Sequence, residues 1–297
     1  GNYAFCIDSA TGKPDEFSFE NDSSGLLLAG LCEYLLSSDE PLAPWLPMIE
    51  NCSAWIVRSV EPSGMLPACA GIWEGFSPHT GRQYEHMTWT TAISAWGMEM
   101  LAKLWTRHGE TEKAETAAET AKSLKNAVLQ CCLDSNGAFS RSVEAKGADS
   151  SLALFSSFFP LFAQEPAIMK RTLDKIELEL TDRTLGGLWR YSDWIVDRGD
   201  CVPWGAICNW AALARVALGD TDAARKHLQW TIDNMSDEGL IAESLLGRGQ
   251  LQCTPIAAYG HGTFLLALAS LGAGTSVNEH PRPLPASRKL LHTTFEP

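Results

Sequence analysis

The segment WGMEMLAKLWTRHGETEKAETAAETAKSLKNAVLQCCLDSNG, residues 96–137, indicates how this chain folds. Apolar residues recur at intervals of three and four positions on both sides of the short turn Gly109-Glu-Thr-Glu, which predicts two amphipathic helices. A turn this short makes the two helices antiparallel, whereas the loop that begins at Asp134 is longer. The acidic residues after Gly109 suit the start of the second helix, because a helix N-terminus favours negative charge. The segment therefore predicts a helical hairpin.

The same pattern occurs again in residues 210–239, where Gly219-Asp-Thr-Asp replaces Gly109-Glu-Thr-Glu. Repeated hairpins with short turns at one end and long loops at the other predict an all-α fold, an α/α toroid of helical hairpins. A helical solenoid is the alternative for hairpin repeats in general. Long loops rich in glycine and tryptophan on one face favour the toroid, because an interaction solenoid does not need them.

Helical periodicity extends over most of the chain, and alternating strand patterns are weak. We expect the barrel domain to span residues 1–275 and a proline-rich tail to span residues 276–297. The expected helices cover residues 26–36, 88–107, 112–133, 152–162, 167–180, 204–218, 222–234 and 254–271.

Charge and composition narrow the class of partner. The 297 residues carry a formal net charge of −13, and no run of Lys and Arg is present. Phosphate-binding surfaces need clustered basic side chains, so a nucleic-acid partner is not expected. No apolar stretch approaches the roughly 18–20 residues of a membrane span, so no membrane partner is expected either. Eleven tryptophans and an acidic balance favour a small-molecule ligand.

Nine cysteines stand at irregular spacings, and no C-x-x-C pair occurs. This usage favours free thiols in a reducing compartment and hence a cytoplasmic protein. Three Asn-x-Ser patterns, which begin at Asn21, Asn51 and Asn234, keep a secretory origin open.

The long loops combine tryptophan with charged residues. The stretches concerned are Gly71-Ile-Trp-Glu, Gly186-Gly-Leu-Trp-Arg, Cys201-Val-Pro-Trp and Gly239-Leu-Ile-Ala-Glu. Sugar rings stack on indole faces, and charged groups hydrogen-bond sugar hydroxyls, so this composition is typical of a sugar site. Two carboxylates on opposing walls, roughly 6.5–9.5 Å apart, are the acid and base of an inverting glycosidase.

Glu74 and Glu243 are the candidate carboxylates. A glutamate in a loop is more often a solvated charge or a helix cap, and that interpretation stays open for both. Glu74 is favoured because Trp73 beside it is expected to bury the loop, and desolvation raises a carboxyl pKa toward the range of an acid catalyst. Glu85 and His86 are rivals, but they stand where the next helix begins and can simply cap it.

Other chemistries lack their motifs. The sequence contains no H-E-x-x-H, no G-x-S-x-G and no phosphate-binding glycine loop, which argues against protease, serine-hydrolase and nucleotide-binding functions. No metal or organic cofactor is expected. His261 lies between two glycines, and we interpret it as a core residue.

The loops resemble those of glycoside hydrolase family 15, the glucoamylase-like enzymes. The family's general acid follows tryptophan in a [DI]-x-W-E loop, matched by Gly71-Ile-Trp-Glu. Its W-R-Y element is matched by Trp189-Arg-Tyr, and its N-P-W segment by Val202-Pro-Trp. The loop of the general base, L-[SPA]-E-[QE], is matched by Leu240-Ile-Ala-Glu-Ser. A [QR]-[NR]-D-G segment at the head of an inner helix is similar to Asn21-Asp-Ser-Ser-Gly, which makes Asp22 a candidate binding residue.

The resemblance implies an (α/α)₆-toroid-like barrel of helical hairpins. The family's barrel has twelve helices and this chain is expected to have eight or nine, so we expect the barrel to be incomplete at its N-terminus. The resemblance also implies an inverting, exo-acting hydrolase of α-glucosides that is similar to glucoamylase, glucodextranase or trehalase. In that role Glu74 is the general acid and Glu243 the general base. Arg190 bonds sugar hydroxyls, and Trp73 and Trp204 form the walls of the first subsites. The partner is then an oligosaccharide or a small glycoside.

Two alternatives remain at this stage. The family's W-P-R-D segment, which holds the terminal glucose, does not occur in residues 1–297. This favours a relative that binds a sugar or another ligand without ordinary hydrolysis. The other alternative is a helical interaction scaffold, which predicts that Glu74 and Glu243 lie far apart or on the convex surface.

Overall fold

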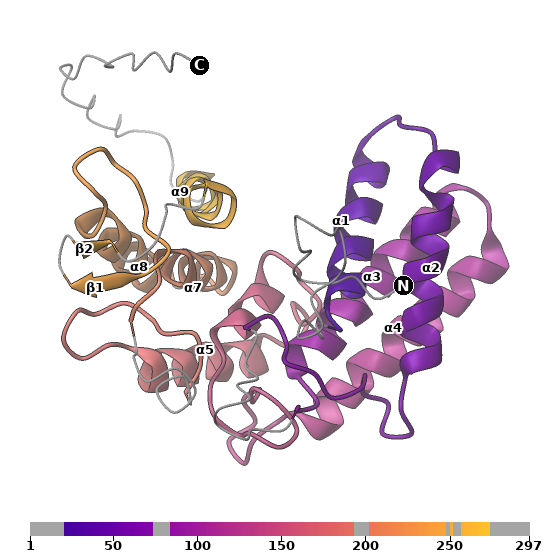
Figure 1. Cartoon of the computed structure of the whole chain (residues 1–297), viewed down its shortest axis with the longest axis horizontal. Helices are drawn as coiled ribbons and strands as arrows, with labels where there is room; N and C mark the ends of the chain where they lie inside the picture. Colours follow the sequence, from indigo (N-terminus) through magenta and orange to yellow (C-terminus); the bar gives the residue numbers. More distant parts are fainter. Residues whose placement is uncertain (1–20, 74–83, 193–201, 248–249, 252–256, 274–297) are drawn as a thin grey trace, which may run out of the picture.

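A computed structural model describes residues 21–73, 84–192, 202–247, 250–251 and 257–273. Over these residues the chain is helical, as predicted, and helices α1 to α4 form one group while α5 and α7 to α9 form another (Figure 1). The only strands in this part are the short antiparallel pair β1 (Leu245–Gly247) and β2 (Gln250–Leu251). The expected tail, residues 276–297, lies outside the described residues, so the domain boundary stays a prediction.

Helices alternate along the chain between an inner and an outer layer. Consecutive inner elements pack side by side, and each outer helix packs against the inner element that precedes it. The inner elements are α1 (Ser23–Ser37), α3 (Thr88–Arg107), the 3₁₀ helix η2 (Ser150–Ser156), α7 (Gly205–Ala217) and α9 (Thr263–Ala273). The outer helices are α2 (Leu46–Ser59), α4 (Thr111–Cys131), α5 (Pro166–Leu180) and α8 (Thr221–Asp233).

Burial explains this division into layers. Helices α3 and α7 are buried around nearly their whole circumference. The residues between their large apolar side chains are mostly small ones, such as threonine, serine and alanine, so few charged groups prevent this burial. Helices α4 and α8 bury a single stripe and present charged residues elsewhere. A helix that is apolar all round belongs in the interior, and an amphipathic helix belongs at the surface.

The two predicted hairpins are present as α3–α4 and α7–α8. Gly109 (φ 76°) and Gly219 (φ 79°) end α3 and α7 in the left-handed conformation, which glycine adopts without the cost of a Cβ clash. In each turn the residue after the glycine donates its N–H to a carbonyl five positions earlier, closing the helix end. The short turns thus fix the antiparallel pairs.

The prediction of one helix over residues 152–162 is wrong. The structure has η2 (Ser150–Ser156) followed by turns, in which the N–H of Phe159 bonds the carbonyl of Leu154 at 2.9 Å. Pro160 explains the break, because proline lacks an N–H and disfavours helical conformation in the residue before it. The 3₁₀ helix itself, Ser150–Ser156, is fully buried, and its apolar residues explain why the sequence pattern predicted a helix here.

Helix α2 was not predicted. Three prolines between residues 41 and 47 suggest a loop, yet Pro47 stands in the first turn of α2, where proline fits without breaking the helix. The buried side of α2 consists of Ile49, Cys52 and Ile56, a helical spacing. The predicted helix over residues 254–271 begins at a π-helical turn, η3 (Ala257–Gly262), and continues as α9, with residues 252–256 outside the described part.

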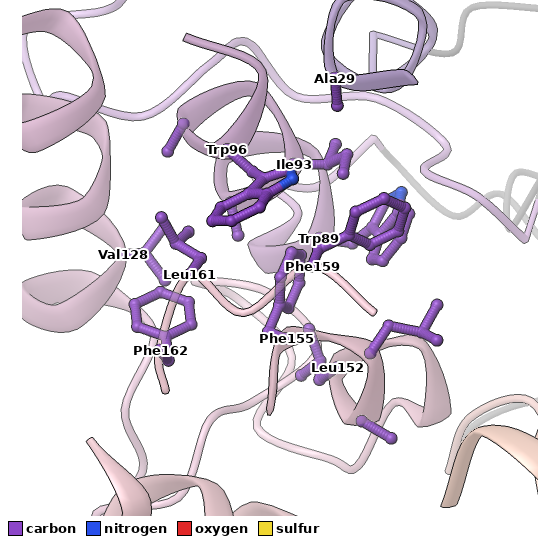
Figure 2. Close-up of a cluster of buried hydrophobic side chains, with 14 of the residues drawn as sticks. Ala29, Trp89, Ile93, Trp96, Val128, Leu152, Phe155, Phe159, Leu161 and Phe162 are labelled. Carbon is purple, nitrogen blue, oxygen red and sulfur yellow. The ribbon is translucent and has the colours of Figure 1, made fainter. Parts of the chain in front are cut away.

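The largest hydrophobic cluster joins the two groups of helices. Trp89 of α3 meets Phe155 of η2 with ring centroids 5.1 Å apart, and Phe159 with centroids 6.0 Å apart (Figure 2). Phe162 packs on Phe139 at 4.5 Å. The contacts of Trp89 fix η2 and the turn after it against α3.

Two further observations concern the described residues alone. None of their helices is both long enough and apolar enough to cross a membrane. Their cysteines carry free thiols: Cys32, Cys52, Cys69, Cys131, Cys132 and Cys208.

Candidate active site

A cavity of about 400 Å³ lies where the N-terminal ends of the inner helices meet. Four of the six predicted site residues line it: Trp73, Arg190, Trp204 and Glu243. Each stands in a loop that precedes an inner helix or, for Trp204, at the first position before one. The alternation of inner and outer helices brings all of these loops to the same end of the fold.

Arg190 stacks on two tryptophans in the wall of this cavity. Its guanidinium carbon lies 3.7 Å from the ring centre of Trp204 and 5.2 Å from that of Trp73. A cation over an indole face is attracted by the ring quadrupole, and the planar guanidinium fits this stacking. The backbone carbonyl of Arg190 accepts hydrogen bonds from the N–H and the hydroxyl of Ser150, both at 2.9 Å. Arg190 is therefore held by the hydrogen bonds of its backbone and by stacking on the rings of Trp73 and Trp204.

Trp73 is 5% exposed and forms another part of the wall. Its ring stacks on that of Trp210 with centroids 5.8 Å apart and an interplanar angle of 27°. Its indole N–H donates to Oδ1 of Asp149 at 2.8 Å. The next residue in sequence, the predicted acid Glu74, lies outside the described residues.

Glu243 reaches the same cavity from the loop between α8 and β1. The hydroxyl of Tyr259 donates to Oε1 of Glu243 at 3.3 Å. Tyr259 also packs on Trp210, with ring centroids 6.5 Å apart. A continuous aromatic row, Trp73–Trp210–Tyr259, thus runs across the cavity from the Trp73 loop to the Glu243 carboxylate.

The loop that carries Glu243 is fixed on both sides. On one side Ser244 forms an antiparallel backbone bridge with Trp204. On the other, the N–H of Ile241 donates to Nε2 of His261 at 3.0 Å. His261, interpreted from the sequence as a core residue, instead accepts this bond from a half-buried position. Its Nε2 must be unprotonated to do so, which assigns the ring proton to Nδ1.

Comparison with known proteins gives a result at the level of structure only. No family model matches the sequence, and no curated protein matches it. A solved glycosidase is similar over 88% of this chain and 69% of its own, with a TM-score of 0.73 at 17% identity. The glucoamylase of Saccharomycopsis fibuligera is similar over 86% of this chain and 70% of its own, with a TM-score of 0.67 at 12% identity.

The chain has a glucoamylase-like fold. A bacterial glucoamylase complexed with acarbose is also similar, over 88% of this chain and 42% of its own (TM-score 0.63, 14% identity). Another glycosidase structure, a Glu-to-Ala variant in complex with glucose, matches 88% of this chain and 69% of its own (TM-score 0.73, 16% identity). The neighbours are (α/α)₆ barrels, as the resemblance implied.

Within this glucoamylase-like fold Asp22 does not line the cavity. It precedes α1, is 4% exposed, and accepts the indole N–H of Trp89 at 2.7 Å on Oδ2. Burial raises the pKa of Asp22, and the bond from Trp89 acts in the opposite direction. Because Trp89 itself lines the cavity, Asp22 supports a wall residue. Direct sugar contact by Asp22 therefore stays a prediction without geometric support.

Glu85 and His86, the rivals of Glu74, have structural partners away from the cavity. Nδ1 of His86 lies 2.6 Å from Glu144, and Nε2 lies 3.0 Å from Glu61. Partial burial lowers the pKa of His86, but these two carboxylates outweigh it, and the net shift is upward. Glu85 accepts a hydrogen bond from the hydroxyl of Ser142 at 2.8 Å. Both residues brace the chain where it enters α3.

Three residues at the site were not predicted from the sequence. Trp210 and Tyr259 line the cavity, and Asp149 bonds the wall residue Trp73 without lining it. Trp210 lies six residues after Trp204, on α7, and was read only as part of a repeated helix pattern. Asp149 and Tyr259 carry no local signal, because their partners Trp73 and Glu243 are distant in sequence. Over the described residues, no group of three His, Cys, Asp or Glu side chains could hold a metal ion.

Proposed function

We propose that this protein is an inverting glycoside hydrolase that removes terminal glucose from α-glucosides. The observation that carries the proposal is the shared cavity: Glu243, Arg190, Trp73 and Trp204 line one space of about 400 Å³. That volume lies within the usual range of small-ligand sites and suits the end of a sugar chain. The glucoamylase-like fold supports the same class of reaction.

The walls suit a pyranose ring. Trp73 and Trp204 offer indole faces for the C–H face of the sugar, and Arg190 between them offers donors for hydroxyl oxygens. The stacking on Arg190 holds these groups before the substrate arrives, so that little side-chain freedom is lost on binding.

The proposed reaction uses two carboxyl groups and one water molecule. Glu243, as the carboxylate, removes a proton from the water as its oxygen attacks the anomeric carbon. Glu74, as the carboxylic acid, donates its proton to the glycosidic oxygen as that bond breaks. The configuration at the anomeric carbon inverts, and a proton exchange with solvent restores both groups. No metal or organic cofactor takes part.

Tyr259 has a defined part in this scheme. Its hydroxyl donates to Oε1 of Glu243, which orients the carboxylate in the cavity. A carboxylate oxygen can accept more than one hydrogen bond, so the group keeps capacity for the attacking water. The roles of Trp73, Arg190 and Trp204 are binding roles.

The test is glucose release from maltose, isomaltose and trehalose by wild-type protein and by Glu243→Gln. We expect a loss in kcat of about 10²–10⁴-fold in Glu243→Gln. Glu238→Gln, in the exposed turn before the same loop, is the matched control and should retain wild-type activity. Near wild-type activity of Glu243→Gln would contradict the mechanism. Sugar binding by wild-type protein without glucose release would favour the non-hydrolytic alternative, and absence of both would favour a scaffold.

A further inference from the structure

Asp149 is a fully buried carboxyl group that the proposed reaction does not use. It stands at the start of η2 with 0% of its surface exposed. Transfer of a carboxylate from water to the interior is costly unless hydrogen bonds compensate it. A buried carboxyl group of this kind either caps a helix or fixes the position of the side chains that bond to it.

Its contacts extend beyond a cap. Oδ1 accepts the N–H of Ser151 at 2.9 Å and the hydroxyl of Ser151 at 2.7 Å, which is the local capping of η2. The same oxygen accepts the indole N–H of Trp73 at 2.8 Å, from a loop 76 positions earlier in the chain. Burial raises the pKa of Asp149, whereas the bonds from Trp73 and Ser151 and the charge of Arg141 lower it, and the net shift is upward.

The same short segment also holds the sugar-binding arginine. Asp149 forms an antiparallel backbone bridge with Tyr191, and Ser150 bonds the carbonyl of Arg190 through both its N–H and its hydroxyl. Asp149 thus bonds the indole of Trp73, and Ser150 bonds the backbone of Arg190. The two residues that stack on each other in the cavity wall share one support.

We propose that Asp149 is a positioning residue that sets the orientation of the Trp73 indole, and with it the packing of Arg190, for substrate turnover. This inference rests on the proposed function of the cavity. The indole has contacts on several sides, to Trp210, Arg190 and Asp149, but only the bond to Asp149 fixes the rotation of its ring edge. A single directional bond to a buried acceptor selects one rotamer where stacking alone admits neighbouring ones.

Matched variants separate positioning from capping. Asp149→Ala removes both the bond to Trp73 and the cap, whereas Ser151→Ala removes one capping donor and leaves the bond to Trp73. Trp73→Phe keeps an aromatic ring but removes the N–H donor. Asp149→Asn keeps an acceptor oxygen and serves as the conservative variant if Asp149→Ala does not fold.

The first measurement is a double-mutant cycle on kcat and KM, with thermal unfolding as the control for folding. We expect Asp149→Ala to lower kcat about 10- to 100-fold with KM changed less than about threefold, and Ser151→Ala to change either by less than about threefold. In the Trp73→Phe background, Asp149→Ala should lower kcat by no more than about twofold, because the bond is already absent. Equal losses in both backgrounds would overturn the inference and leave Asp149 as a cap.

The second measurement does not depend on activity. In protein labelled with ¹⁵N-tryptophan, the indole N–H resonance of Trp73 is identified by its absence from Trp73→Phe. We expect Asp149→Ala to move it upfield, with a smaller change in Asp149→Asn and almost none in Ser151→Ala. An unmoved resonance would overturn the inference. Wild-type protein that hydrolyses no glucoside would contradict the proposed function instead, while the resonance still tests the contact.

Discussion

Nε2 of His261 accepts the backbone N–H of Ile241 at 3.0 Å, two residues before Glu243. The bond ties the start of the last inner helix to the loop that delivers the proposed general base. A second tie in this region is the amide of Asn209, which donates to the carbonyl of Gly260 at 3.0 Å. The position of Glu243 therefore depends on residues that never touch the cavity.

Replacement of His261 tests that dependence. His261→Phe removes the acceptor and leaves the N–H of Ile241 without its partner, which costs about 1–3 kcal/mol when such a group is buried. We expect kcat to fall about tenfold, because Glu243 loses its fixed position. His261→Gln offers a carbonyl oxygen in place of Nε2 and should recover part of the activity. Steady-state kinetics check this, and equal activity of Phe and Gln variants would contradict the role.

Arg190→Lys tests the stacked arrangement of the wall. Lysine keeps the positive charge but has no planar group to stack between Trp73 and Trp204. We expect KM to rise about tenfold or more, with a smaller change in kcat. The control is Arg183→Lys, an exposed arginine in a surface turn. A lysine variant with wild-type KM would show that charge alone is sufficient.

Glu177 makes stability depend on pH away from the cavity. Its Oε1 accepts a hydrogen bond from Nε of Arg215 at 2.7 Å and lies 2.9 Å from Nε2 of His227. Burial acts to raise the pKa of Glu177, but the bonds and charges of His227 and Arg215 outweigh it and lower the pKa from 4.5 to about 2. A lowered carboxyl pKa stabilises the fold above the unfolded value and loses that effect as pH falls.

We therefore expect wild-type protein to lose unfolding free energy between about pH 4.5 and pH 2 more steeply than Glu177→Gln. At pH 7 the variant should be less stable by about 1–2 kcal/mol, because Arg215 loses one of its carboxylate partners. The loss stays this small because the buried Arg215 retains Asp174 as an ion-pair partner. Urea unfolding at several pH values measures both. Parallel pH profiles of the two proteins would contradict the assignment.

Gly187 tests a tight turn next to the W-R-Y segment. It has φ 74°, and a Cβ there would lie 2.4 Å from a ring carbon of Trp230. We expect Gly187→Ala to lower stability by about 2–4 kcal/mol, from backbone strain and the clash together. Gly239→Ala, with φ 79° and open space around the Cβ, should cost only the strain, about 1–2 kcal/mol. Thermal unfolding of both variants measures the difference, and equal losses would contradict the clash.

Local patterns in the sequence predicted the helical hairpins, because periodicity and turn glycines act over a few residues. The start of α2 contains prolines whose permitted position in the first turn cannot be told from a loop by pattern alone. The stretch after residue 150 has enough apolar residues for a helix, yet Pro160 and burial against Trp89 impose a shorter 3₁₀ element. Tertiary packing decided the conformation there.

The residues of the candidate site likewise divide into those that local patterns predicted and those that they did not. Trp73, Arg190, Trp204 and Glu243 stand in distinctive loops, and these four residues line one cavity. Asp149 could not be found from local patterns, because its partner Trp73 lies 76 positions away in the chain. Contacts of this kind depend on the folded arrangement of layers, which no local pattern encodes.

The anomer of the first glucose released tests the central claim most directly. Wild-type protein acting on maltitol, whose leaving group is an alditol so that all released glucose comes from the cleaved bond, should release β-glucose in ¹H NMR spectra taken before mutarotation. The reason is that Glu243 directs water to the face opposite the leaving group. Glu243→Gln should release none above background. Initial release of α-glucose, or wild-type rates of β-glucose release from Glu243→Gln, would contradict the account.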